Sequence, residues 1–260
     1  MKSKKSLGQN FLSNINLLNH IVNMGNILNN DIIIEIGPGT GNLTNEILKK
    51  NPKKIIVIEK DNDLSKFLIT KFNKKIDIIN KDILKCYSDF KFDRPVIVYG
   101  NLPYNISTKI LISFIKLDKL DKYFKKFVFI FQKEVADRII AEQNTKNYGR
   151  LSILTSWKTK CEKILDIDPR YFKPKPKVWS SLIVITPKSK VEYIKNPKNL
   201  EHVTNIFFNQ KRKMIKRAMK QLFNDYEAVS KNLRLNLNLR PQNISKQKYI
   251  EICKVYEDLN

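Results

Sequence analysis

Cysteine and histidine are scarce in this chain of 260 residues, which has three cysteines and two histidines. Cys86, Cys161 and Cys253 are far apart and in no CxxC spacing, and the two histidines are isolated. Such a pattern builds no disulfide framework and offers no clustered set of zinc ligands. We therefore expect reduced thiols and no metal site.

Long apolar runs are also missing. No stretch approaches the roughly 20 apolar residues that cross a bilayer. The first residues, MKSKKSLGQNFLSN, are basic but lack the continuous apolar segment of a signal peptide. The sequence predicts a cytoplasmic protein that has no membrane partner.

Acidic residues are few relative to basic ones. The chain has 25 Asp and Glu against 49 Lys and Arg, a formal charge of +24 at pH 7. Such a field attracts polyanions, either nucleic acid or an anionic membrane surface. However, lysine supplies 41 of the 49 cations, and a coding bias toward Lys, Asn and Ile explains part of the excess. The position of the charge is therefore more informative than its total.

The first two thirds of the chain alternate short apolar runs with helical patterns, which indicates βαβ units and a mostly parallel sheet. The predicted strands are 31–36, 54–59, 76–80, 96–100, 127–131 and 182–186. The predicted helices are 14–28, 42–50, 61–72, 107–117 and 133–142. After residue 188 the periodicity is helical only. We predict an α/β fold, with a Rossmann-like sheet and helices on both faces in a catalytic domain (1–188), followed by a small all-helical domain (189–260).

Glycine is also rare, and three of the seven glycines fall in IEIGPGTGNLT, residues 34–44. Gly37, Gly39 and Gly41 follow a predicted strand and let the backbone approach a ligand at the carboxyl edge of the sheet. Glu59 closes the next strand, where a carboxylate can accept hydrogen bonds from both hydroxyls of a ribose. These features fit either S-adenosylmethionine or a dinucleotide.

Two further observations favour the methyl donor. The spacing is GxGxG, and Asn42 stands where the dinucleotide pattern GxGxxG requires glycine. Asp82 follows the third strand, where its carboxylate suits an adenine amine, with Ile83 beside it to pack the ring. The alternative for Asp82 is that it caps a turn.

The chemistry is indicated by GNLPYN, residues 100–105, which follows the fourth strand. The lone pair of an adenine amine is delocalised into the ring, so an enzyme helps by accepting the two amine hydrogens. The side-chain oxygen of Asn101 and the carbonyl of Leu102 can do this. Pro103 stiffens the turn, and Tyr104 offers a face for a flipped base. Alone, the tetrapeptide is a common kind of turn; in register behind the other motifs, it predicts methyl transfer to adenine.

Two other features suggest contact with the substrate. Phe172, ahead of a basic, proline-rich loop, can close the other face of the base, or it can be a core residue. A helix around 206–220 carries cations and no acid, with Phe208 and Ile215 on its apolar side. The candidate phosphate contacts are Lys211, Arg212, Lys213, Lys216, Arg217 and Lys220, of which Lys211 falls among the apolar positions. The alternative is a solvated face.

Taken in order, the motifs resemble the KsgA-type small-subunit ribosomal RNA adenine dimethyltransferases over nearly the whole chain. They are GQNFL (8–12), EIGPGTG (35–41), Glu59, Asp82, GNLPYNIS (100–107), QKEVADR (132–138), YGRLS (148–152), FKPKPKV (172–178) and FNQKRKMIKRAM (208–219). The erythromycin-resistance methyltransferases share the earlier motifs, whereas YGRLS and FNQKRK are similar to the KsgA group. Trp179 departs from the family, which more often has a small or polar residue there.

The resemblance implies roles for individual residues. Asn10 and Leu12 would cover the cofactor, and Asn101 would lie between cofactor and adenine. The full set expected to bind S-adenosylmethionine is Asn10, Leu12, Gly37, Gly39, Glu59, Lys60, Asp82, Ile83 and Asn101. The resemblance also supports stacking by Tyr104 and Phe172.

The expected function is dimethylation of adenine N6 in the RNA of the small ribosomal subunit by a monomeric enzyme, with a role in subunit biogenesis. Two alternatives stay open. One is an adenine methyltransferase acting on large-subunit RNA or another nucleic acid, and the other is an RNA-binding assembly factor without turnover.

Overall fold

The computed structural model describes residues 9–90 and 92–259, and the first residue of GQNFL falls outside them. Contacts within the chain divide it into two compact units. The first contains the described residues up to 136 together with 160–188, and the second contains 137–159 together with 189–259. One division point coincides with the boundary predicted at residue 188. The grouping of residues 137–159 with the C-terminal helices was not anticipated.

The first unit is built on a seven-stranded sheet in the order β4-β3-β2-β5-β6-β9-β7. Neighbouring strands from β4 to β6 run parallel, and β9 runs antiparallel to β6. The strands are β2 (Ile32–Ile36), β3 (Lys54–Ile58), β4 (Asp77–Ile79), β5 (Val96–Asn101), β6 (Phe124–Gln132), β7 (Thr159–Ile167) and β9 (Ser180–Pro187). This architecture confirms the predicted α/β fold class.

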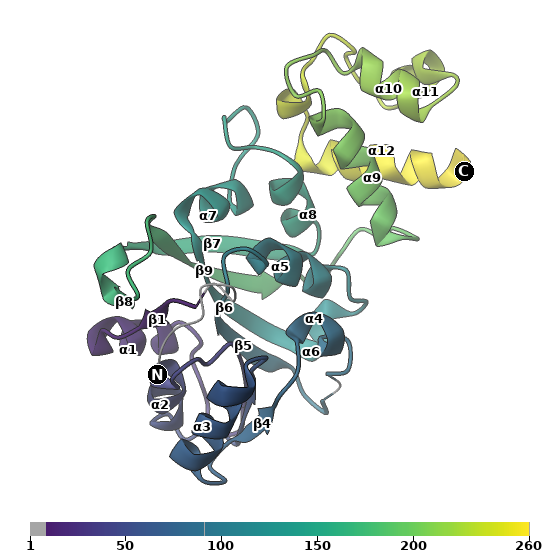
Figure 1. Cartoon of the computed structure of the whole chain (residues 1–260). Helices are drawn as coiled ribbons and strands as arrows, with labels where there is room; N and C mark the ends of the chain where they lie inside the picture. The colour runs from purple at the N-terminus through teal and green to yellow at the C-terminus, as the bar shows by residue number, and fades with distance from the viewer. Residues whose placement is uncertain (1–8, 91, 260) are drawn as a thin grey trace. The chain divides into compact units, whose positions relative to one another are not determined.

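Helices cover both faces of this sheet, with α1, α2 and α3 along one face and α4, α5 and α6 along the other (Figure 1). Their bounds are α1 (Ile15–Asn23), α2 (Asn42–Leu48), α3 (Asn62–Phe72), α4 (Ile83–Cys86), α5 (Ser107–Ile115) and α6 (Leu120–Tyr123), and α7 (Lys133–Ile139) follows β6. Ile33, Val57 and Val98 are fully buried between the two layers. Continuous apolar strands of this kind are what a sheet covered on both faces requires.

The sequence did not predict β7. It lies at the edge of the sheet, and its sequence TKCEKILDI is mostly half-exposed, with charged residues between the apolar ones. Edge strands often carry such charges, which hide the apolar pattern of a buried strand. A second, two-stranded sheet was also not predicted: β1 (Phe11–Leu12) pairs with β8 (Phe172–Lys173), after a short 3-10 turn, Pro169–Tyr171.

Beyond residue 188 the described part of the second unit contains helices joined by loops and no strand, as predicted. Its helices are α8 (Arg150–Lys158), α9 (Pro197–Phe208), α10 (Lys216–Leu222), α11 (Tyr226–Asn232) and α12 (Lys246–Leu259), with a 3-10 turn at Pro241–Asn243. α9 and α12 pack on each other and on α8.

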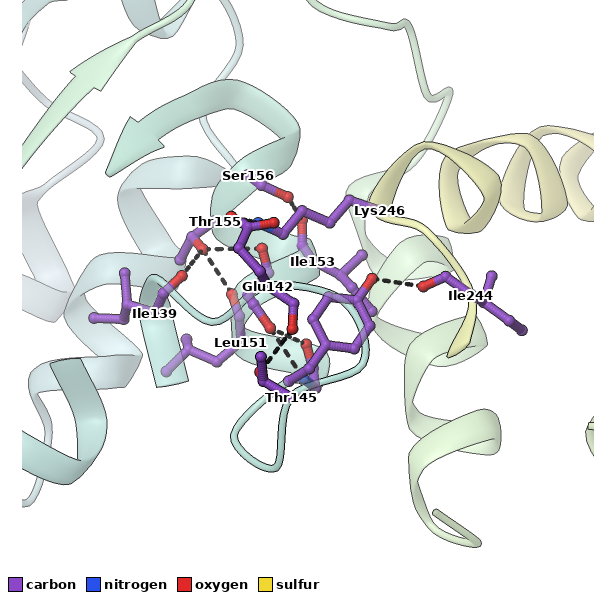
Figure 2. A network of polar contacts seen from close by, with 12 residues as sticks. Ile139, Glu142, Thr145, Leu151, Ile153, Thr155, Ser156, Ile244 and Lys246 are labelled. Atoms are coloured by element: carbon purple, nitrogen blue, oxygen red, sulfur yellow. Dashed lines mark hydrogen bonds and ion pairs between the residues drawn. The ribbon is translucent and has the colours of Figure 1, made fainter. Parts of the chain in front are cut away.

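A network of polar contacts holds residues 139–156 within this unit (Figure 2). The Thr155 hydroxyl donates to the carbonyl of Leu151 at 2.8 Å, and the Lys246 ammonium pairs with Glu142 at 2.7 Å. The hydroxyl of the fully buried Tyr148 donates to the Ile244 carbonyl at 2.8 Å. The contacts of Lys246 and Ile244 tie residues 137–159 to the C-terminal part of this unit.

The prediction of one continuous basic helix over 206–220 is wrong. α9 ends at Phe208, residues 209–213 form turns, and α10 starts at Lys216. The backbone N–H groups of Ile215 and Lys216 donate to the carbonyls of Leu239 and Leu237 rather than to a preceding helical turn. Bonds to a distant segment, which no local periodicity encodes, interrupt the helix.

Replacement of Tyr148 by Phe tests the polar network. Without the hydroxyl the Ile244 carbonyl loses a partner in a buried position, so we expect the free energy of unfolding to fall by about 1–3 kcal/mol. Tyr193→Phe is the matched control, because Tyr193 is 76% exposed. Urea denaturation of both variants decides the matter, and equal losses would show that the bond contributes nothing specific.

Candidate active site

A cavity of about 210 Å³ opens at the carboxyl ends of β2, β3 and β5. Its walls come from five segments that are separate in the sequence: 9–12, 35–43, 58–64, 81–84 and 101–110. The carboxyl ends of parallel strands meet at the same edge of a sheet, which brings these segments together. All nine residues predicted to bind the cofactor line this one cavity, as do Leu102, Pro103 and Tyr104.

The glycine turn forms one wall of the cavity. Gly37, Gly39 and Gly41 all have positive φ, at 66°, 57° and 77°, a region that strains residues with a side chain. A Cβ on Gly39 would lie 2.6 Å from the ring of Phe11. All three glycines are therefore required by the backbone, and Gly39 is also required by the close approach of Phe11.

Asn42, the departure from the dinucleotide pattern, has a structural role. Its side-chain amide donates to the Leu12 carbonyl at 2.6 Å and ties the N-terminal segment to the turn. A glycine at this position could not make this bond.

Glu59 lies at the end of β3 and is 7% exposed. Desolvation raises its pKa, while hydrogen bonds from the backbone N–H groups of Asp61 and Gly39 lower it in part. The bond from Asp61 measures 2.9 Å. A carboxylate has about four lone-pair positions. Glu59 can therefore hold the glycine turn and still accept bonds from ligand hydroxyls.

Asp82 and Lys60 face each other across the cavity rim. One oxygen of Asp82 accepts from the Leu84 N–H at 3.0 Å and caps α4, and the other accepts from the Lys60 ammonium at 2.9 Å. Burial acts to raise the pKa of Asp82, but the Lys60 bond and the cap outweigh it and the pKa is lowered. Asp82 therefore caps a helix, as the structural interpretation had it, and it also lines the cavity, where its binding of the adenine amine stays a prediction.

Asn101 is the last residue of β5 and lines the cavity. Its side-chain nitrogen Nδ2 donates to the Asn10 carbonyl at 2.6 Å. This bond fixes the amide so that the nitrogen is turned to the N-terminal segment, which leaves Oδ1 as the acceptor end. Leu102 follows with its side chain buried.

Tyr104 is anchored at its hydroxyl. Its Oη and the Ser180 Oγ are 2.6 Å apart, and Ser180 is fully buried at the start of β9. Desolvation raises the pKa of Tyr104, so the phenol stays neutral at physiological pH. A neutral, fixed ring is suited to stacking on a base.

The stacking role predicted for Phe172 is not supported. Phe172 is 2% exposed, belongs to the hydrophobic core beside Leu12 and does not line the cavity. Its pairing opposite Leu12 in the β1–β8 sheet turns it into the protein. In this structure the core interpretation of Phe172 is correct.

Of the six cations predicted to contact phosphate, five are exposed: Arg212, Lys213, Lys216, Arg217 and Lys220. Lys211 differs. Its ammonium donates to the carbonyls of Lys146 and Tyr148 at 2.6 and 3.1 Å, and desolvation lowers its pKa. Lys211 therefore links the FNQKRK and YGRLS motifs inside the second unit and is a structural residue.

Sequence reasoning missed Glu35, which lines the cavity from within β2. It is 2% exposed and accepts from the Thr44 hydroxyl at 2.6 Å. The sequence does contain an indication of this residue, because a carboxylate interrupts the otherwise apolar strand IIIEI. Desolvation raises the pKa of Glu35 to about 7, against the lowering effect of the Thr44 bond.

In the residues that the structure describes, no helix is long and apolar enough to cross a membrane. Within the same ranges, no group of three or more His, Cys, Asp or Glu is placed to hold a metal ion. No disulfide joins any two of Cys86, Cys161 and Cys253, and Cys86 and Cys253 are buried.

The residues of the cavity fit S-adenosylmethionine. A buried carboxylate (Glu59) suits the ribose hydroxyls, an acid beside an apolar side chain (Asp82 and Ile83) suits the adenine, and bare glycine backbone suits the amino-acid portion. A Rossmann-like sheet with this cavity and an NLPY turn at its rim defines the class of S-adenosylmethionine-dependent methyltransferases that act on amines.

Comparison with known proteins gives the family. A model of the ribosomal RNA adenine dimethylase family matches residues 1–258. Proteins named ribosomal RNA small subunit methyltransferase A are similar to the whole chain. The one from Pelagibacter ubique is 52% identical over 259 residues and 98% of its own length, and one from a Wolbachia of Drosophila simulans is 40% identical over 95% of its length. The chain belongs to the ribosomal RNA adenine dimethylase family, which confirms the family and the enzyme class predicted from the motifs.

Solved structures share the fold. A dimethyladenosine transferase from Plasmodium falciparum superposes with a TM-score of 0.77 at 24% identity, over 95% of this chain and 98% of the other. The 23S ribosomal RNA methyltransferase ErmE gives 0.70 at 20% identity, over 95% and 100%. At these identities the likeness establishes the fold alone.

The raised pKa of Glu35 predicts a pH-dependent stability. Below the ordinary value of 4.5 the carboxyl is protonated in both folded and unfolded states; as pH rises through about 7, the buried group must ionise and stability is lost. We expect wild type to lose up to about 3 kcal/mol of unfolding free energy relative to Glu35→Gln between about pH 4.5 and pH 8. Urea denaturation across this range measures the difference, and parallel pH profiles for the two proteins would contradict the expectation.

Proposed function

We propose that this protein transfers two methyl groups from S-adenosylmethionine to the N6 amine of adenine in the RNA of the small ribosomal subunit. The observation that carries the proposal is the fixed amide of Asn101, whose oxygen end is directed away from the Asn10 carbonyl at the rim of the cofactor cavity. The similarity to small-subunit methyltransferases supports the choice of substrate.

When bound, S-adenosylmethionine supplies an electrophilic methyl group on a sulfonium that is a good leaving group. The chain itself then has to place the amine and accept its hydrogens. Asn101 Oδ1 accepts one hydrogen and the Leu102 carbonyl accepts the other, which draws the nitrogen lone pair out of the ring. Pro103 restricts the turn, and the ring of Tyr104, held by Ser180, supports the base.

The same geometry accounts for a second transfer. After the first methylation the nitrogen keeps one hydrogen, and one of the two acceptors still has a partner. At each transfer the nitrogen must also lose one proton, which passes to solvent, because Asn101 Oδ1 and the Leu102 carbonyl are neutral hydrogen-bond acceptors and not bases. The monomethylated base can return with its methyl group turned away from the paired acceptor.

We also propose that the two units have different roles. The first unit, with residues 1–188 as the sequence defined it, would bind the cofactor and carry out the chemistry. The helical unit, predicted as 189–260, would contact RNA through Arg212, Lys213, Lys216, Arg217 and Lys220. We further propose a monomer that acts in the cytoplasm during subunit biogenesis.

The two alternatives are less well supported. Large-subunit methylation shares the fold and the NLPY site, but YGRLS and FNQKRK, which distinguish the small-subunit group, pack together through Lys211 and through Tyr148 against Phe208. An assembly factor without turnover would not need the acceptor geometry of Asn101.

The product is the first test. Purified protein is incubated with labelled S-adenosylmethionine and, in separate reactions, unmodified small or large subunits, and nucleosides are analysed by mass spectrometry. We expect N6,N6-dimethyladenosine at completion. A plateau at the monomethyl product with excess donor would refute dimethylation, and label on large subunits alone would favour the erythromycin-resistance type.

In the same assay, Asn101→Ala removes an acceptor aimed at the reacting nitrogen and should lower kcat by about 10²–10³. Asn45→Ala, at an exposed position of α2 outside the cavity lining, is the control and should keep most activity. Cofactor affinity, measured by calorimetry, should change less than turnover in Asn101→Ala.

The exposed cations of the second unit are tested by charge reversal. Arg212→Glu, Lys216→Glu and Arg217→Glu together should lower the slope of log K against log salt for RNA by about 0.7–0.9 for each phosphate that these side chains neutralise. The control is Lys50→Glu, Lys53→Glu and Lys66→Glu, which changes the net charge equally at exposed positions of the first unit. An equal effect of both triples would mean that only the total charge matters.

A further inference from the structure

Trp179 is one of the two tryptophans of the chain, and it is 48% exposed. Its neighbour Val178 is 44% exposed. The other tryptophan, Trp157, is 7% exposed, and its indole N–H donates to the Glu192 carbonyl at 2.8 Å. A large aromatic side chain left half in solvent offers apolar area that packing in this unit does not use.

The backbone places Trp179 beside the NLPY turn. The next residue, Ser180, is the one whose hydroxyl meets Tyr104 at 2.6 Å, and it pairs with Gln132 at the end of β6. The Trp179 carbonyl accepts from the Lys133 N–H at 2.9 Å, which ties the backbone at this position to the start of α7. Trp179 is therefore fixed at the edge of the sheet where the target amine would lie.

The charged residues in the segment that leads into Trp179 are of one sign. Lys173, Lys175 and Lys177 are exposed and alternate with Pro174 and Pro176 in the segment before it. No acidic residue occurs in the sequence between Asp168 and Glu192. The prolines restrict the backbone, so the lysines and the tryptophan are presented with little loss of conformational entropy.

An exposed aromatic ring at the end of a basic segment is the composition that binds single-stranded nucleic acid, because every base has a face to stack and every linkage has a phosphate to neutralise. A protein partner would not require three cations without acids. A duplex would leave no base free for the ring. Charge and aromatic character together favour unpaired RNA.

We propose that Trp179, with Lys173, Lys175 and Lys177, forms a second RNA contact of the active site, which stacks an unpaired base flanking the target adenine. The inference rests on the proposed function, since it takes the adenine in the NLPY turn as its reference point. It assigns a substrate-binding role to a residue that departs from the family pattern.

Fluorescence tests the contact without turnover. In Trp157→Phe, Trp179 is the only tryptophan, and we expect saturable quenching of its emission by an unstructured RNA oligonucleotide that contains adenine. A duplex RNA of the same length should quench much less. Binding of a dye-labelled oligonucleotide is followed in parallel, so RNA that binds while the emission stays unchanged overturns the inference.

Turnover measurements test the proposed contact independently, in variants that keep Trp157. Trp179→Ala should raise the KM for small subunits about 10-fold, while Trp179→Phe, which keeps a stacking face, should stay near wild type. Cofactor affinity should not change in either variant. Phe67→Ala, at an exposed aromatic residue on α3, is the control. A wild-type KM in Trp179→Ala overturns the inference, and absence of methylation by wild type itself would instead refute the proposed function.

Discussion

The packing of Phe11 against the bare backbone of Gly39 is the contact on which the rest of the site depends. A Cβ at Gly39 would lie 2.6 Å from the ring, so only glycine lets residues 10–12 close over the turn. Two amide side chains then hold this segment, Asn42 through the Leu12 carbonyl and Asn101 through the Asn10 carbonyl. One packing constraint thereby forms a cavity wall and also orients the amide proposed to receive the adenine hydrogen.

The acidic residues of the cavity differ in charge state because their surroundings differ. Glu35 is enclosed within a strand, and desolvation brings its pKa to about 7, whereas Asp82 at the rim is kept ionised by Lys60 and a helix cap. Glu59 lies between these extremes, buried but supplied with backbone donors. Burial is costly for a charge unless hydrogen bonds replace water. The site thus combines a charged rim with a carboxyl group that exchanges a proton near neutral pH.

In the second unit, neighbouring cations of one basic sequence motif have different surroundings. Within FNQKRK, Lys211 donates to two backbone carbonyls and joins the motif to YGRLS, while Arg212 and Lys213 beside it stay in solvent. Lys211 falls at an apolar position of the helical pattern, and its partly buried ammonium binds backbone carbonyls of the protein. Long cationic side chains often bury their aliphatic part in this way. Adjacent cations therefore divide between bonds inside the fold and positions in solvent.

Much of the fold was predictable from local patterns. The apolar runs identified β2, β3, β4, β5, β6 and β9, and the glycine turn, Glu59, Asp82 and NLPY indicated one cavity, because the ends of parallel strands must share an edge. Local patterns failed for β7, whose charged residues hide an edge strand, and for the helix over 206–220, which is broken by bonds to residues 237 and 239. They also could not place Phe172, since a buried and a stacking phenylalanine have the same sequence signal. The sequence by itself determined the order of the strands from β2 to β6 and of β9, and the motifs that line the cavity, because periodicity and residue type are local properties. Only the tertiary structure decided which side chains are free to meet a ligand, because burial and hydrogen-bond partners depend on residues far apart in the chain.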